Sequence, residues 1–220
     1  MIVGLASLSI LSKTVLAADS IKVGVIIPLS GGAGRQGQDV TNCIQAMASL
    51  INADGGVMGR PVELLVPDDE STAAIGIAKA NELISAGVAV VLEGWNSPVT
   101  LAMQSVLARA NVLDITMISK ADGILASAAN PLAIRLNSAN SQDATIIAKY
   151  LGGKMKSGRI VFVTENDAYG NGAQKGIEEQ FKKANLDYTI ATTLKFPFPR
   201  PISASRSRAS GTQSRTWSSP

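Results

Sequence analysis

A glycine-rich stretch after the first apolar run has the residue types and spacing of a phosphate-binding loop. Gly32, Gly34 and Gly37 match the pattern G-x-G-x-x-G, in which backbone amides at the start of a helix hold a phosphate group. Pro28 and Ser30 lengthen the loop beyond the tight turn that this pattern needs, and no acid that could bind a ribose follows about 20 residues later. We therefore interpret the stretch as a strand-to-helix loop, with a nucleotide-dependent enzyme as an alternative.

A second candidate is the acidic run Asp68, Asp69 and Glu70, which could hold a metal ion or act as an acid–base pair. The interpretation that we favour is structural: Asp69 or Ser71 caps the next helix, and the other acids face solvent. The sequence has no His and a single Cys, Cys43, which excludes Ser–His and Cys–His nucleophiles, imidazole-bound metals and an internal disulfide. We expect Cys43 to be a small core residue, and we expect no enzyme, no metal and no cofactor.

Polar and aromatic residues follow three further apolar runs and could surround a small ligand. Asn96 and Ser97 precede Pro98 at a helix start, where free amides and the helix dipole suit a carboxylate. Lys120 could add a positive charge, and the ring of Tyr169 could form a wall. The alternatives are simple helix capping by Asn96 or Ser97 and a solvated Lys120. The set has the character of a binding site and does not resemble a catalytic one.

The elements that must position these loops alternate along the chain. Short apolar runs predict strands at 21–29, 62–66, 88–92, 112–118, 159–164 and 188–194. Apolar positions three and four apart predict helices at 39–52, 72–86, 99–110, 143–151 and 172–184. This alternation predicts an α/β fold with parallel sheets and helices on both faces, with ligands at the carboxyl ends of the strands. Those ends are the loops 30–38, 93–98, 119–123 and 165–171, and we interpret 130–142 as a crossing between two sheets.

The two ends of the chain differ in composition from its body. The first 17 residues are mostly apolar and finish with small residues at Ala17, which predicts a secretory signal peptide and an exported, periplasmic protein. The net charge is +3, but residues 199–220 hold four basic and no acidic residues. Without them 16 basic residues stand against 17 acidic ones, so we expect no nucleic-acid partner. The composition of 199–220 predicts a disordered tail.

Five segments of the sequence resemble the periplasmic solute-binding proteins of branched-chain amino-acid ABC transporters (Leu/Ile/Val type). They are IKVGVIIPLSG (21–31), QGQDV (36–40), INADGGVMGRPVELLVPDDEST (51–72), EGWNSPVTLAMQ (93–104) and DAYGNGAQKG (167–176). The resemblance implies a type I periplasmic-binding fold and a non-enzymatic receptor with its ligand between two lobes. Closure of the lobes would present an amino acid or similar small polar solute to an inner-membrane ABC permease. A cytoplasmic ligand sensor of an amidase-type operon, built on the same fold, is the alternative.

The resemblance also implies the residues of the binding site. First-lobe loops hold the ligand's carboxylate in relatives, and a second-lobe tyrosine closes over the ligand. The corresponding residues here are Gln36, Trp95, Asn96, Ser97, Ile118, Ser119, Lys120 and Tyr169. Relatives have an aromatic residue at the place of Gln36 and Thr or Ser at that of Lys120. We therefore expect a polar or doubly anionic ligand, such as a dicarboxylate or an amide, rather than leucine.

The resemblance implies domain boundaries as well. We expect a signal peptide at 1–17, the ligand-binding first lobe at 18–138, part of a second lobe at 139–198 and the tail at 199–220. Such receptors have two lobes of ordinary domain size and about twice this length. We therefore expect a C-terminally truncated receptor that binds weakly, because half of its cleft would be absent. We also hypothesise a frameshift near Phe198 as the origin of the tail.

Overall fold

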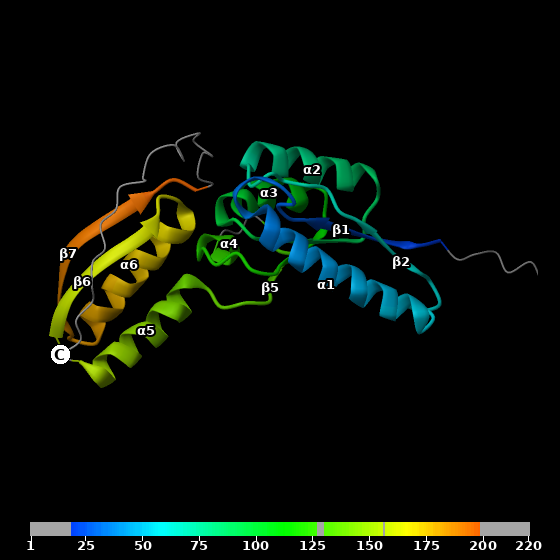
Figure 1. The fold of residues 1–220 in the computed structure, drawn as a ribbon. Helices are drawn as coiled ribbons and strands as arrows, with labels where there is room; N and C mark the ends of the chain where they lie inside the picture. The colour runs from blue at the N-terminus through cyan, green and yellow to red at the C-terminus, as the bar shows by residue number, and fades with distance from the viewer. Residues whose placement is uncertain (1–18, 127–129, 156, 199–220) are drawn as a thin grey trace, which may run out of the picture.

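The computed structural model describes residues 19–126, 130–155 and 157–198. The expected signal peptide, the expected tail and the hypothesised frameshift product therefore lie outside the described residues. Strands and helices alternate over the described part, as the sequence predicts, and they form two separate parallel sheets (Figure 1). No described helix combines the length and the apolar character that crossing a membrane requires.

The first sheet has five parallel strands in the order β2-β1-β3-β4-β5. The strands are β1 (Ile21–Ile26), β2 (Val62–Leu65), β3 (Val90–Glu93), β4 (Leu113–Thr116) and β5 (Ala133–Arg135). In the centre of the sheet, Val23 of β1 pairs with Leu64 on one side and with Val90 on the other. Because β1 and β3 are inner strands with helices on both sides of the sheet, their sequences are nearly continuous apolar runs.

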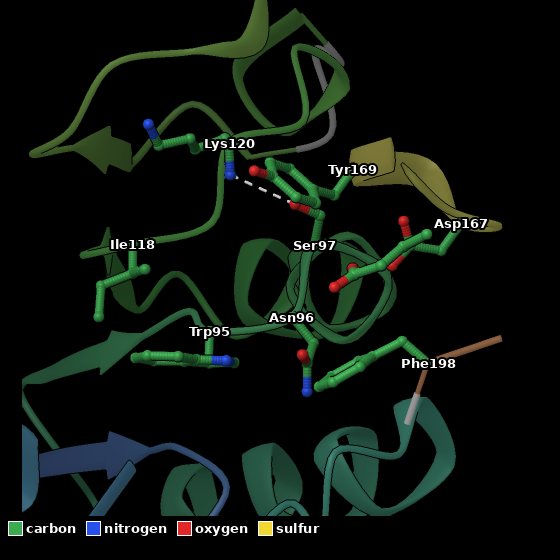
Figure 2. A pocket seen from close by; sticks show the side chains of 9 residues that line it. Trp95, Asn96, Ser97, Ile118, Lys120, Asp167, Tyr169 and Phe198 are labelled. Carbon is green, nitrogen blue, oxygen red and sulfur yellow. Dashed lines mark hydrogen bonds between the residues drawn. The ribbon is translucent and has the colours of Figure 1, made fainter. Parts of the chain in front are cut away.

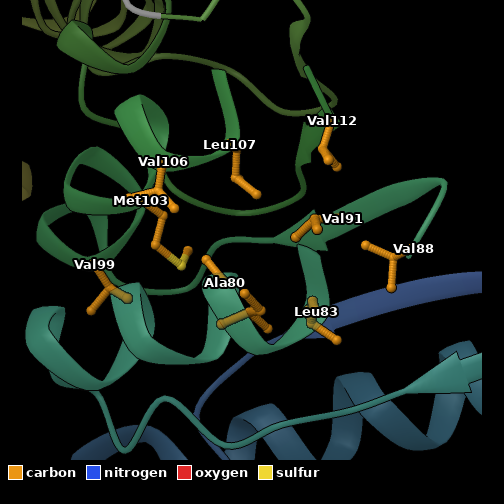
Figure 3. Close-up of a cluster of buried hydrophobic side chains, with 10 residues drawn as sticks. Ala80, Leu83, Val88, Val91, Val99, Met103, Val106, Leu107 and Val112 are labelled. Atoms are coloured by element: carbon orange, nitrogen blue, oxygen red, sulfur yellow. The ribbon is translucent and has the colours of Figure 1, made fainter. Parts of the chain in front are cut away.

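Helices α2 (Ala73–Ser85) and α3 (Ser97–Arg109) pack together on one face of this sheet. The main apolar core lies between them and the strands (Figure 3). Its buried members are Ile26, Ala80, Leu83, Val88, Val91, Val99, Met103, Val106, Leu107 and Val112. Short helix α4 (Gly123–Ala126) contacts α3 and β5. We call this sheet, these three helices and α1 (Gly34–Ala53) the first unit.

Helix α1 (Gly34–Ala53) lies by the opposite face of the sheet, and an apolar groove remains open between them. The groove is lined by side chains of α1 such as Met47 and Ile51 and by strand residues such as Val23 and Leu92. Cys43 lies at this groove and is exposed, so the expectation that it is a core residue is wrong. The apolar side of α1 does face the sheet, but it does not fill the space, and Met47 stays 56% exposed.

The second sheet consists of two parallel strands, β6 (Ser157–Glu165) and β7 (Asp187–Phe196). Helices α5 (Asn140–Lys154) and α6 (Ala168–Lys183) pack against each other beside it (Figure 1). The rings of Phe181 and Tyr188 join α6 to β7, with centroids 4.8 Å apart. We call α5, β6, α6 and β7 the second unit.

The structure corrects two local predictions, one for the glycine stretch and one for the segment 130–142. The glycine stretch forms the 3-10 turn η1 (Gly31–Ala33) and the first turn of α1 instead of a loop. A side chain at Gly37 would collide with the carbonyl oxygen of Pro28, so this glycine permits close packing of the helix start. The segment 130–142, expected as a crossing, contributes the edge strand β5 and the first residues of α5. Strand β5 was missed because three residues are too few to show a period.

The acidic run is structural, but it does not cap a helix as expected. Asp68 accepts hydrogen bonds from the amides of Leu29 and Glu70, both at 2.8 Å, and from the Ser30 hydroxyl at 2.5 Å. Asp69 is buried and accepts from the Ser71 amide at 2.7 Å. The cap residue of α2 is Thr72, whose side chain makes no capping bond. The Asp68 side chain therefore joins the loops that follow β1 and β2, and the Asp69 side chain forms a hydrogen bond within the second of these loops.

Candidate functional site

A cavity of about 230 Å³ lies where the carboxyl ends of the first sheet meet the second unit (Figure 2). The residues that line it are Trp95, Asn96, Ser97, Ile118, Lys120, Glu165, Asp167, Tyr169 and Phe198. Most of the binding residues expected from the sequence are thus brought together by two strand ends of the first sheet and the β6–α6 loop. This is the place where an open parallel sheet offers a binding site.

Two of the expected residues do not line this cavity. Gln36 lies on the exposed side of α1, in its first turn. Ser119 is buried behind the cavity wall, where its Oγ lies 2.8 Å from Oγ1 of Thr100. Gln36 therefore does not contact the cavity in this arrangement. Ser119 does not contact it either, but its chain neighbours Ile118 and Lys120 both line the cavity.

The wall formed by the first unit offers hydrogen-bond donors. Ser97 Oγ accepts the amides of Lys120 and Ala121, each at 3.2 Å, so its own proton is available to a ligand. Asn96 is buried, and its Nδ2 has no hydrogen-bond partner among the described residues. Both residues lie at the N-terminus of α3, the positive end of the helix dipole. Because the Asn96 side chain makes no capping bond, simple capping does not account for it.

Lys120 lines the cavity with its backbone and stem, while its charge is used elsewhere. Its Nζ lies 2.5 Å from Oδ2 of Asp143 and 3.3 Å from Oγ of Ser138. Figure 2 shows this side chain leading away from Ser97 and Asp167. The ion pair joins the end of the first sheet to α5 of the second unit. A solvated lysine and a free positive charge for a doubly anionic ligand are therefore both at odds with the structure.

The wall formed by the second unit is acidic. Glu165 ends β6, and Asp167 caps α6 by accepting the amide of Gly170 at 2.8 Å. Burial raises the pKa of Glu165, and the neighbouring Asp167 raises that pKa further. The Tyr169 carbonyl accepts a hydrogen bond from Asn140 Nδ2 at 2.9 Å, which fixes the loop against α5. Two carboxyl groups on this wall suit a cationic or donating part of a ligand.

Apolar and aromatic side chains complete the cavity. Trp95, Ile118, Tyr169 and Phe198 line it beside the polar groups, and Figure 2 shows the Phe198 ring next to Asn96. Sequence reasoning did not select Phe198 or the acids Glu165 and Asp167. The expectation that ligands bind at the carboxyl ends of parallel strands did indicate the loop 165–171, and this loop contains both acids.

The sequence of the chain is similar to those of known binding proteins. A family model described as periplasmic binding protein matches residues 20–201. The Leu/Ile/Val-binding protein of Citrobacter freundii is 32% identical over 178 residues, which are 80% of this chain and 48% of that protein. The Leu/Ile/Val-binding protein BraC3 of Rhizobium johnstonii is 30% identical, over 76% of this chain and 44% of its own length. The chain thus spans about half the length of the curated relatives that it matches.

Solved structures show the same architecture. The solute-binding protein of an ABC transporter from Rhodopseudomonas palustris BisB5, in complex with 3,4-dihydroxybenzoic acid, is 25% identical with a TM-score of 0.72. The match covers 81% of this chain and 47% of that one. LivJ from Streptococcus pneumoniae, in complex with isoleucine, is 24% identical with a TM-score of 0.70, over 82% of this chain and 51% of that one. The second likeness concerns the fold alone.

Proposed function

The chain belongs to the periplasmic binding protein family, and from this premise we propose that it captures an amino acid or a similar small polar solute outside the cytoplasm. Its fold is the α/β type I periplasmic-binding fold, as in the solved relatives. The observation that carries the proposal is the cavity between the two units, which has donors on one wall and carboxyl groups on the other.

This distribution of polar groups matches a zwitterion. The Ser97 hydroxyl, the Asn96 amide and the N-terminus of α3 would bind the ligand's carboxylate. Glu165 and Asp167 on the facing wall would bind its ammonium group. A second carboxylate would meet these two acids instead of Lys120, whose charge is paired with Asp143. An amino acid fits the cavity better than the dicarboxylate that the sequence suggested.

The aromatic lining gives the ligand's side chain an apolar environment. Trp95, Tyr169 and Phe198 come from both units, so a bound ligand would touch both of them. Contact with both units favours a closed arrangement in the bound state. The proposed first lobe at 18–138 and second lobe at 139–198 would then be the two halves of the binding site.

The partner and the compartment follow from the family. We propose that the receptor acts in the periplasm and delivers its ligand to an ABC permease of the inner membrane. Curated relatives named as Leu/Ile/Val-binding proteins support this role.

A fluorescence titration tests the proposed ligand class. The variant Trp217→Phe leaves Trp95 in the cavity as the only tryptophan of the chain. Leucine and glutamine are titrated, followed by isopentylamine and 4-methylpentanoate, which lack the carboxylate and the ammonium group of leucine, and by succinate. We expect an amino acid to bind at least about tenfold more tightly than the three other compounds, since each lost charged contact weakens binding by about that factor. Preferential binding of succinate would overturn the proposal.

Two substitutions in the cavity and one outside it extend this titration. Ser97→Ala removes a donor for the carboxylate, and Asp167→Asn removes a negative charge near the ammonium group. Ser49→Ala is the matched control, because Ser49 is exposed on α1 and donates only to the Gln45 carbonyl. We expect weaker binding of amino acids by the first two variants and unchanged binding by the control. Equal affinities in all three would refute the assignment of this cavity.

A further inference from the structure

A buried carboxyl group lies directly behind the cavity wall of the first unit. Glu93 is the last residue of β3, and its side chain has no exposure to solvent. It does not line the cavity, so the proposed contacts with ligand do not use it. A buried acid is retained in a fold only when hydrogen bonds compensate for its lost hydration.

Glu93 receives those hydrogen bonds from two different elements. Its Oε2 accepts the hydroxyl of Thr100, in the first turn of α3, at 2.5 Å. Its Oε1 accepts the hydroxyl of Thr116, the last residue of β4. Thr100 Oγ1 also lies 2.8 Å from Oγ of Ser119. One carboxyl group thus connects β3, α3 and β4 at the edge of the sheet where the cavity opens.

The two cavity loops of the first unit begin or end at these bonds. One is the segment 94–99, which includes the first residues of α3, carries Trp95, Asn96 and Ser97, and lies between Glu93 and Thr100. The other is the loop 117–119, which carries Ile118. It begins after Thr116 and ends with Ser119. The loops also touch each other: Gly94 has a φ of +107°, and a Cβ there would lie 3.1 Å from Oγ of Ser119.

We propose that Glu93 is a positioning residue that holds both cavity loops of the first unit in register through Thr100, Thr116 and Ser119. The expected consequence, that ordered loops bind the ligand more tightly, rests on the proposed function. The order of the loops themselves can be measured without any ligand, so the two proposals fail independently of each other.

Protonation of Glu93 changes which groups donate and which accept in the hydrogen bonds among Glu93, Thr100, Thr116 and Ser119. Each hydroxyl has one proton, so an ionised Glu93 that accepts from Thr100 requires Ser119 to donate to Thr100. The protonated acid must instead donate to one of its two threonines. That threonine can no longer donate to the acid, so the bonds that support the loop it belongs to are rearranged.

The charged groups around Glu93 favour its protonated form. Burial, followed by the negative charges of the buried Asp114 on β4 and Asp69 before α2, raises the pKa of Glu93 to about 8, although the hydrogen bonds from Thr100 and Thr116 lower it. Arg135 on β5 is the cation that faces this group, and Ile26 of β1, which pairs with Glu93 across the sheet, is apolar. The switch between the two hydroxyl arrangements therefore falls near pH 8.

Hydrogen exchange measured by mass spectrometry on the full chain tests the positioning role. In Glu93→Ala we expect amides of 94–99 and 117–121 to exchange at least about tenfold faster, while amides of α5 are unchanged. Glu93→Gln retains one acceptor and one donor, like the protonated acid, and we expect it to keep the loops near the wild-type rates at pH 7. Faster exchange that spreads over the whole chain, or no change in these loops, would overturn the proposal.

A threonine variant keeps the test valid if Glu93→Ala fails to fold. Thr100→Val preserves the shape of the side chain and removes both hydroxyl contacts, so we expect faster exchange in the same two loops. Thr41→Val is the matched control, because Thr41 is a buried threonine of the same unit whose hydroxyl has no partner among the described residues. Equal effects of the two variants would contradict a specific role of the Glu93 connections.

A pH titration separates positioning from simple packing. In the Trp217→Phe background, without ligand, we expect the Trp95 fluorescence to change with a midpoint near pH 8. Glu93→Gln should abolish that transition, whereas Asp114→Asn should only move it to lower pH because a negative neighbour is removed. A transition that persists unchanged in Glu93→Gln would show that Glu93 does not control the loops.

Discussion

The two units of the molecule use the same parallel strands and helices but cover them to different degrees. In the first unit, Val25, Ile26 and Val91 are completely buried. In the second unit, Val161, Val163 and Leu194 remain 52%, 66% and 56% exposed, because the described helices leave part of the β6–β7 sheet uncovered. Parallel sheets depend on cover over both faces. One wall of the cavity therefore belongs to a unit whose sheet has a complete apolar core on one face. The other wall belongs to a unit whose sheet is only partly covered by the described helices.

The largest expected effect of this difference concerns core substitutions. Leu107 is fully buried in the main core, and Leu107→Ala should lower the free energy of unfolding by about 2–5 kcal/mol. Val163→Ala, at an exposed position of β6, should lower it by less than about 1 kcal/mol. Urea unfolding followed by circular dichroism measures both values. Equal losses in the two variants would remove the distinction between the units.

The next largest effect is a pH dependence of stability, to which the first unit contributes the largest pKa shifts. Burial raises the pKa of Glu93 to about 8 and the pKa values of Asp69 and Asp114 to about 6. The folded state thus holds protons that the unfolded chain has already released, so the contribution of these three acids to stability is fully present below their unfolded pKa values and is lost as the pH rises through their folded pKa values. We expect the free energy of unfolding to fall by about 2 kcal/mol or more between pH 5 and pH 9.

The control for this dependence is Glu93→Gln. It should flatten the curve between about pH 6 and pH 8, where Glu93 alone contributes, and leave a shallower fall below pH 6 because Asp69 and Asp114 remain. Denaturant midpoints at each pH give the curve. Stability that increases steadily from pH 5 to pH 9 would contradict the buried state of these three acids.

The connection between the two units should have the smallest effect. Lys120 and Asp143 form an ion pair at 2.5 Å, and both side chains are 32% exposed. A double-mutant cycle with Lys120→Met and Asp143→Asn should give a coupling free energy of about 1 kcal/mol. The pair Lys79–Glu82, within α2 alone, is the comparison, with an expected coupling of about 0.3 kcal/mol. A coupling of zero for the first pair would mean that it does not hold the units together.

The sequence was sufficient to predict the elements whose pattern is local. The apolar runs of β1 to β4, β6 and β7 and the helical periods of α1, α2, α3, α5 and α6 each extend far enough to show a period. The four-residue helix α4 and the three-residue strand β5 do not. The periodicity of α1 indicated the apolar side of the helix, yet it could not show that the groove beside Cys43 stays open.

The residues of the candidate site also divide into those that a local sequence pattern predicts and those that depend on contacts between the two units. Asn96, Ser97 and Tyr169 could be predicted as site residues from the sequence because each follows a predicted strand. The pairing of Lys120 with Asp143 depends on how α5 lies against the first sheet, which no local pattern contains. Phe198 reaches the cavity only because β7 runs beside β6. Contacts made between the two units were therefore the part that sequence reasoning missed.

The central claim is that one amino acid contacts both units at once, and nuclear magnetic resonance tests it directly. Isotope-filtered spectra of the Trp217→Phe chain with saturating leucine would reveal which protein rings lie next to the ligand's methyl groups. We expect nuclear Overhauser contacts from the same leucine to the Trp95 ring of the first unit and to the Tyr169 ring of the second. Contacts to neither ring, or to rings of one unit only, would contradict a binding site between the two units.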